Sequence, residues 1–258
     1  MRTLGLTVRQ IRYEQKIFWR TPAAVFFTFA FPILLLVIFA TLNRGQHLDL
    51  LGGIPFAQYY VPAMGVFGVV SACYGNFSAR FVFRRESGLL KRTRATPLPL
   101  GVLLAGFAAN AVIVSMLVVA LSTVVGVAAY HVSFPGRWVA LSLTLVCGAA
   151  AFCALGLALT CAIPNVDAAD PMIYATLMPA LFISGGFFPV ASSSALGRLS
   201  EVLPVRHLIA AAFASFDPRA GAGGGGGVAW GDLAVVAAWG LAAALVAVRG
   251  FRWEPGRH

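Results

Sequence analysis

Long apolar runs without charged residues dominate this sequence and predict its elements. A helix that spans the hydrocarbon core of a bilayer needs about 20 mainly apolar residues. Six segments meet or approach that length: residues 23–42, 59–79, 100–130, 138–163, 171–189 and 228–248. The third exceeds one bilayer thickness and must tilt or protrude. The pattern predicts an all-α integral membrane protein with six transmembrane helices in one domain.

Residues 1–22, before the first apolar run, form an amphipathic segment. At 100° per residue, Leu4, Val8, Ile11, Phe18 and Trp19 share one arc, and the basic residues fall in the adjacent arc. A basic and aromatic helix of this kind lies in the membrane interface rather than crossing the bilayer. The segment therefore predicts an N-terminal interfacial helix, with a disordered basic tail as the alternative.

The stretch between the fifth and sixth runs, residues 190–227, mixes apolar and polar residues and is too short to span the membrane twice. Apolar backbone that dips partway into the membrane satisfies its hydrogen bonds when protein covers it. We therefore expect an outer re-entrant segment and loop here, in which the glycine run at 223–227 is a flexible linker.

The distribution of charge predicts topology and partners. Hydrophobic residues make up 59% of the 258 and charged residues only 11%, well below the roughly 25% of globular domains. The net charge of +10 lies beside the apolar runs, where contact with membrane lipid explains it and nucleic acid does not. Placing both termini in the cytoplasm puts 14 of the 19 basic residues on the cytoplasmic side. We expect a multi-pass protein of the cytoplasmic (inner or plasma) membrane with both termini inside.

Catalytic and cofactor motifs are missing from the sequence. A P-loop needs a glycine before its phosphate-binding lysine, but Lys16 follows Gln15 and Lys91 follows Leu90. There is no HExxH, GxSxG or CxxC motif, and the four cysteines lie in apolar segments. We predict no catalytic residue, bound cofactor or metal, and no enzyme activity by this chain alone. A membrane-embedded lipid-modifying enzyme, and a carrier or channel not driven by ATP, stay as alternatives.

Residues 80–99, RFVFRRESGLLKRTRATPLP, form the predicted cytoplasmic loop between the second and third spans. The loop is basic and amphipathic, with a turn signal at Glu86–Ser87–Gly88 and a stop at Pro97. Such a segment can lie on the membrane or dock onto a soluble partner, and charge alone does not separate the two.

Three segments of the chain resemble the permease subunits of ABC-2-type ABC exporters. Residues 84–98 are similar to that family's coupling loop, FISGGFFPV at 182–190 to the signature at the end of helix five, and LSEVLPVRHLIAAAF at 199–213 to the outer re-entrant segment. The likeness covers nearly the whole chain, in order and at matching topology. The glycine run at 223–227 departs from the pattern and puts the shape of the outer loop in doubt.

The resemblance implies a half-transporter. Two separate ABC ATPase subunits would bind ATP and Mg, and a second copy of this permease or a paralogue would complete the membrane part. The helix at residues 4–20 would complete the docking surface for the ATPase. The docking residues of the coupling loop would be Arg85, Glu86, Gly88, Leu89 and Leu90.

The resemblance also implies a substrate path between the two permease copies, lined by helices one, two and five. The cargo would be amphipathic or hydrophobic (a drug, lipid or glycan conjugate) and would move outward. Pro179, Gly185 and Gly186 would let helix five bend during gating. The aromatic candidates can equally be packing or lipid-facing residues. The path candidates are Phe26, Phe29, Ser71, Tyr74, Asn76, Tyr174, Thr176, Phe182, Ser184 and Phe187.

Overall fold

The computed structural model describes residues 2–48, 51–89, 100–190, 194–217 and 227–250. These residues are almost entirely helical, apart from one antiparallel pair of two-residue strands, β1 (His47–Leu48) and β2 (Ile54–Pro55). Within the described part, five helices are long and apolar enough to cross a membrane, and Ala169–Ile183 is a shorter apolar helix. The prediction of an all-α membrane protein is confirmed.

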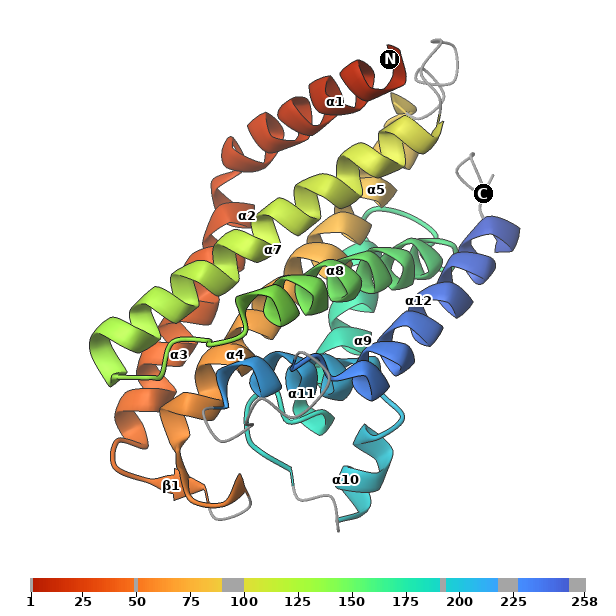
Figure 1. The fold of residues 1–258 in the computed structure, drawn as a ribbon. Helices are drawn as coiled ribbons and strands as arrows, with labels where there is room; N and C mark the ends of the chain where they lie inside the picture. Colours follow the sequence, from red (N-terminus) through yellow and green to blue (C-terminus); the bar gives the residue numbers. More distant parts are fainter. Residues whose placement is uncertain (1, 49–50, 90–99, 191–193, 218–226, 251–258) are drawn as a thin grey trace.

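Figure 1 shows the helices coloured in their order along the chain. The first span is one helix built from α2 (Pro22–Val25), a π-helical turn η1 (Phe26–Ala30) and α3 (Phe31–Leu42). The second is α4 (Phe56–Val70), the π-helical turn η3 (Ser71–Asn76) and α5 (Phe77–Glu86). The others are α1 (Arg2–Trp19), α7 (Leu100–Tyr130), α8 (Trp138–Thr160), α9 (Ala169–Ile183), α10 (Ala195–Ser200), α11 (Pro204–Phe216) and α12 (Trp230–Gly250).

The second span is the centre of the bundle. Its most apolar stretch is 89% buried, against 28% for the first span and 22% for α12. Close helix packing explains this, because apolar side chains gain little from leaving lipid and association depends on close fit. On α4, Gly65 faces Val119 and Gly68 faces Val118 of α7. The helix backbones can therefore approach closely along this contact.

The basic residues that frame the second span continue its helix instead of ending it. The predicted span stopped at residue 79, but α5 remains helical to Glu86. Arg85 is buried and the Arg84 side chain is only 13% exposed, since both find partners within the protein. Residues 80–86 of the predicted loop are therefore part of a rigid helix, and residues 90–99 of that loop lie outside the described residues.

The helix α1 packs along α7 and turns a mixed polar and apolar face toward the protein (Figure 1). Gln10 is partly buried, and Glu14 and Phe18 are fully covered. Val8 and Trp19, from the predicted apolar arc, are each about half exposed. These two residues of the apolar arc therefore lie on the outside of the bundle, where a helix in the membrane interface would contact lipid, while Phe18 of the same arc is buried.

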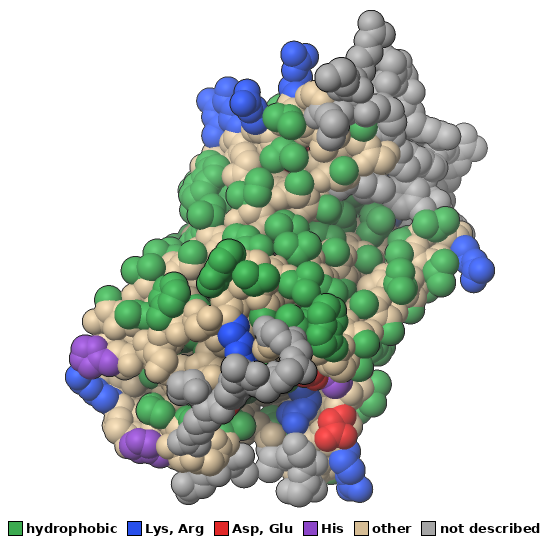
Figure 2. All heavy atoms as spheres, in the orientation of Figure 1, with side chains coloured by type: hydrophobic (Ala, Val, Ile, Leu, Met, Phe, Trp, Pro, Cys, Tyr) green, Lys and Arg blue, Asp and Glu red, His purple; other side chains and the backbone are tan. Residues whose placement is uncertain are grey.

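The two ends of the bundle differ in composition. We call the end that holds α1, the end of α5 and the end of α12 the basic end (Figure 1), because α1 and α5 carry Arg9, Arg12, Lys16, Arg84 and Arg85 there. Figure 2 shows Lys and Arg side chains at this end and also at the opposite end. The opposite end holds β1, β2, α10 and α11. There Gln58 of α4 donates from Nε2 to the carbonyl of Phe216 at 2.6 Å and accepts from the backbone N–H of Ser133 at 2.9 Å. This one side chain joins α4, the end of α11 and the α7–α8 connection.

The contact between α12 and α8 gives a test of how closely the helices pack. A Cβ added at Gly240 would lie 2.9 Å from the Cα of Ala151, whereas one at Gly231 on the same helix would meet nothing within 4 Å. We expect Gly240→Ala to lower the free energy of unfolding by about 1–3 kcal/mol through overpacking. Gly231→Ala should leave it unchanged or slightly raised. Thermal unfolding in detergent would measure both, and equal stability of the two variants would contradict the close approach.

Candidate functional site

A groove of about 300 Å³ lies between the first span, the second span and α9, and it is the candidate functional site. Three of the predicted path residues line it: Ser71, Asn76 and Tyr174. Their hydroxyl and amide groups sit among apolar and aromatic walls, and no charged side chain lines the groove. The complete lining is Phe27, Phe31, Phe67, Ser71, Gly75, Asn76, Tyr174, Leu177 and Met178.

Both π-helical turns contribute residues to this groove. In η1 the N–H of Phe31 donates to the carbonyl of Phe26, five residues back. Pro32 explains that widening, because it has no N–H and its ring would press on the carbonyl of Thr28. The Nδ2 of Asn76, at the end of η3, donates to Thr28 Oγ1 at 2.7 Å. The two irregular turns are therefore tied to each other beside the groove, and π-turns are frequent at functional sites.

The turn η3 is stabilised from the side that faces away from the groove. Ser78 Oγ donates to the carbonyl of Tyr74 at 2.5 Å. Gly156 of α8 lies against the same turn, where an added Cβ would be 2.7 Å from Ser78 Oγ and 3.2 Å from the Tyr74 carbonyl oxygen. The absence of a side chain at Gly156 thus lets α8 close over the turn and shield its backbone.

Four further path candidates connect the walls of the groove. The hydroxyls of Tyr74 and Thr176 are 2.7 Å apart and join η3 to α9. The rings of Phe182 and Phe187 stack with their centres 4.5 Å apart. The ring of Phe187 also packs against that of Phe67, which lines the groove, with 5.8 Å between the ring centres. These four residues are neighbours of the groove and hold its walls together.

The remaining path candidates lie apart from the groove lining. Phe29 stacks on Trp19 at 5.5 Å and so anchors α1 to the first span. Phe26 is half exposed and packs edge-on against Phe27 at 5.4 Å. Ser184 is buried just beyond the end of α9.

The predicted gating residues have different positions in α9. Pro179 lies inside the helix. Gly185 follows its end with φ +83°, and the N–H of Gly186 reaches back to the carbonyl of Leu181 at 2.9 Å, which together form a Schellman-type cap. Tyr59 Oη donates to the Gly185 carbonyl at 2.7 Å. The helix ends at Ile183 rather than at residue 189, and the two glycines cap it.

At the basic end, the predicted docking residues divide between interior and surface. Arg85 is only 7% exposed, and its guanidinium donates to the carbonyls of Thr160 at 2.8 Å and Ile163 at 2.5 Å. It therefore caps the end of α8, where carbonyls lack partners within the helix. This side chain faces inward and holds the end of α8 against α5.

The other residues of this group lie at the end of α5. Glu86 is exposed, and its Oε2 accepts from the N–H of Val166 at 2.6 Å in the connection between α8 and α9. Gly88 has φ +70° just past the helix end, and Leu89 is 42% exposed. Leu90 lies outside the described residues. Glu86 thus links the end of α5 to the start of the segment that leads into α9.

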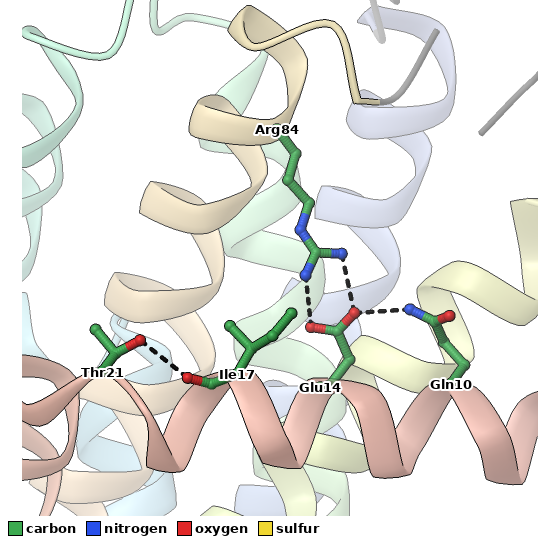
Figure 3. A network of polar contacts seen from close by, with 5 residues as sticks. All are labelled: Gln10, Glu14, Ile17, Thr21 and Arg84. Atoms are coloured by element: carbon green, nitrogen blue, oxygen red, sulfur yellow. Dashed lines mark hydrogen bonds and ion pairs between the residues drawn. The ribbon is translucent and has the colours of Figure 1, made fainter. Parts of the chain in front are cut away.

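Sequence patterns missed a buried ion pair that joins α1 to α5 (Figure 3). Glu14 is fully buried and accepts two hydrogen bonds from the Arg84 guanidinium, at 2.8 and 2.9 Å. Gln10 adds a third at 2.7 Å, and the Arg84 guanidinium lies 4.4 Å from the centre of the Phe107 ring on α7. The only sequence signal was that Glu14 is the one acid among residues 1–22.

The helical bundle, its groove and its basic end define a multi-pass membrane domain. Comparison with known protein families matches residues 6–216 to the ABC-2 type transporter family. The chain therefore belongs to the ABC-2 type transporter family, whose members are membrane components of transporters rather than catalytic units. No curated protein shows a significant match to the chain. Among the described residues, no cluster of three or more His, Cys, Asp or Glu side chains is placed to hold a metal.

The Glu14–Arg84 pair provides a test of how α1 is held. Glu14→Gln would leave the buried Arg84 guanidinium without a counter-charge, and we expect it to lower the free energy of unfolding by about 3 kcal/mol. Lys16→Gln, an exposed charge on the same helix, should cost less than about 0.5 kcal/mol. Chemical denaturation in detergent would measure both. Wild-type stability of Glu14→Gln would show that the pair does not hold α1 in place.

Proposed function

We propose that this chain is the permease subunit of an ATP-driven ABC exporter that moves an amphipathic or hydrophobic substrate outward across the cytoplasmic membrane. Membership of the ABC-2 type transporter family supports the transport role. The observation that carries the proposal is the groove, where apolar rings surround Ser71, Asn76 and Tyr174. Such a lining suits a molecule with a large apolar body and a few polar groups, such as a drug, a lipid or a glycan conjugate.

A second permease, either another copy or a paralogue, would complete the path. The walls of the groove expose large apolar side chains at the surface of this chain: Phe27 is 53% exposed, Tyr174 48% and Phe182 56%. In the proposed assembly the same surface of the second permease would face them, so that the groove becomes one half of a path between the two.

Separate ABC ATPase subunits would dock at the basic end and bind ATP and Mg. The family generally pairs with such subunits, and this chain has no P-loop lysine of its own. Following the positive-inside rule, the basic end and both termini would face the cytoplasm. The docking surface would combine α1, Glu86, Gly88 and Leu89 with the segment that follows them.

A short mechanical connection would carry a movement of the docking surface to the groove. The carboxylate of Glu86 accepts a hydrogen bond from the backbone N–H of Val166. Val166 lies three residues before Ala169, where α9 begins. Tyr174 and Leu177 of α9 line the groove, and Thr176 contacts Tyr74 of η3. A shift of the end of α5 would thus displace α9 against the second span, as a small rigid-body switch.

Purification of the chain from its native membrane would test the proposal. A nucleotide-binding protein should co-purify, and the complex in vesicles should move members of a panel of amphipathic compounds and lipids in an ATP-dependent way. An enzyme or an ATP-independent carrier would show neither the nucleotide-binding partner nor the ATP dependence, and that result would refute the proposal.

Glu86 gives a sharper test of coupling. Glu86→Arg removes the acceptor for Val166, and losing a charged hydrogen bond of about 1.5–3 kcal/mol should reduce export and ATPase stimulation by roughly tenfold or more. Glu86→Gln retains a side-chain oxygen in place and should keep most of the activity. Membrane insertion should be normal in both variants. Wild-type export by Glu86→Arg would rule out this link as the route of coupling.

A further inference from the structure

A histidine on α11 joins two other elements at the end of the bundle opposite the basic end. The Nδ1 of His207 lies 2.7 Å from Oδ1 of Asp232, which is in the first turn of α12. The Nε2 of the same ring lies 2.7 Å from the backbone carbonyl oxygen of Glu201, which follows the end of α10. One imidazole therefore connects α12 to the α10–α11 connection.

Both atoms that face the ring are hydrogen-bond acceptors. A carbonyl oxygen has no proton to donate, and an ionised carboxylate also only accepts. A neutral imidazole has one N–H and one unprotonated nitrogen, so it can donate to only one of the two oxygens. The unprotonated nitrogen would then lie 2.7 Å from an oxygen with no proton between them. Both bonds form together only when the His207–Asp232 pair holds one proton more than a neutral ring and an ionised carboxylate.

The position of Asp232 favours the ring as the holder of this proton. The backbone N–H groups at the start of a helix stabilise a carboxylate anion in the first turn. The Asp232 side chain is also 30% exposed, so water can solvate its charge. The ionised carboxylate then accepts from Nδ1, and the doubly protonated ring donates to both oxygens.

Other charges around α11 do not take the place of Asp232. The elements that pack on α11, and α11 itself with its flanks, carry the further charged residues Arg137, Asp170, Arg198, Glu201, Arg206, Asp217 and Arg249. Asp170 and Arg249 lie at the basic end, and the neighbours Glu201 and Arg206 have opposite signs. The helices α4 and α8 have no charged residue within their bounds. Within the described part of the chain, Asp232 is the charged side chain that pairs with the ring.

A second bond from α12 to the same connection involves no titrating group. Trp239 lies about two helical turns after Asp232, on the same face of α12. Its Nε1 donates to the backbone carbonyl of Val202 at 2.8 Å. The helix α12 thus holds residues 201–202 at two points, one through His207 and one directly. Of these two contacts, the one through His207 depends on a proton.

We propose that His207 is a proton-dependent latch between α12 and the α10–α11 connection. With two protons the ring makes both bonds, and when one proton leaves to water, one of the two bonds is lost and the latch loosens. The His207 side chain is 18% exposed, so water reaches it. Closing the latch is thereby coupled to binding a proton. A lower pH strengthens the latch and a higher pH weakens it, by at most about tenfold per pH unit for one proton.

The helix α11 connects the latch to the outer end of the groove. The ring centres of Phe213 on α11 and Tyr59 on α4 are 5.8 Å apart, and the Tyr59 hydroxyl holds the Gly185 carbonyl at the end of α9. In the orientation that follows from the positive-inside rule, this end of the bundle faces outside, where the external pH would set the latch. The latch is a property of the folded chain and does not depend on export.

Hydrogen exchange of the full chain in detergent, measured from about pH 5.5 to 8.5, would test the latch without relying on transport. The reporters are the backbone N–H groups of Glu201 and Val202, which donate to the carbonyls of Gly197 and Leu199. After correction for the intrinsic pH dependence of exchange, their protection should fall roughly tenfold as the pH rises. This is the size expected when one hydrogen bond to a charged group is lost. Equal protection across the range would overturn the latch.

Matched variants separate the latch from ordinary packing. His207→Gln should remove the pH-dependent part of the protection, whereas His47→Gln, which replaces an exposed histidine of β1, should retain it. Trp239→Phe should lower the protection by the same factor at every pH.

Asp232→Asn keeps an acceptor for Nδ1 but removes the charge, so its protection should fall at a lower pH than in the wild type. This variant decides the matter even if His207→Gln does not fold. A pH dependence that is unchanged in His207→Gln or in Asp232→Asn would show that the ring is not the latch. Neither result would affect the proposed export function, which the co-purification tests separately.

Discussion

Within hydrocarbon there is no water to pair with a backbone group that a helix leaves free, so each interruption of a helix needs a partner from elsewhere in the protein. This chain interrupts its helices at η1, at η3 and at the end of α8. At η3 the Ser78 hydroxyl donates a hydrogen bond to the Tyr74 carbonyl, and at the end of α8 the Arg85 guanidinium donates one to the Thr160 carbonyl. The second span supplies both side chains, and it is also the most buried of the candidate spans in the described part of the chain.

Residues of both π-helical turns line the groove. A π-helical turn contains an extra residue, so it widens the helix and turns the following side chains by a different angle. Two such turns at one level, tied by the bond from Asn76 to Thr28, leave space between the first and second spans that regular helices would fill. Gly75 adds to this space by lining the groove without a side chain. Close packing elsewhere, as at Gly156 against η3, keeps the irregular backbone from collapsing.

Hydropathy predicted the class of fold because lipid selects long apolar helices, and the family likeness of the three segments is confirmed by the match over residues 6–216. Patterns along the chain could not predict contacts between helices. Arg85 looked like a surface residue since a run of arginines does not reveal which one turns inward. Glu14 looked like one polar residue of a basic helix, although it is fully buried against Arg84. Pro32 was the only local sign of a π-turn, and η3 has no comparable residue.

The buried contacts at the basic end determine which parts can move together. Glu14 and Arg84 hold α1 to α5, and Arg85 holds α5 to the end of α8, so these three helix ends form one unit. Glu86 is the exposed member of the set, and its hydrogen bond to Val166 adds to the buried apolar contacts of Val82 with Ala169 and Ile173 that connect this unit to α9. In the proposed assembly, a force on the basic end would therefore move α1, α5 and the end of α8 together, and these contacts would pass the movement to α9, the helix that closes one side of the groove.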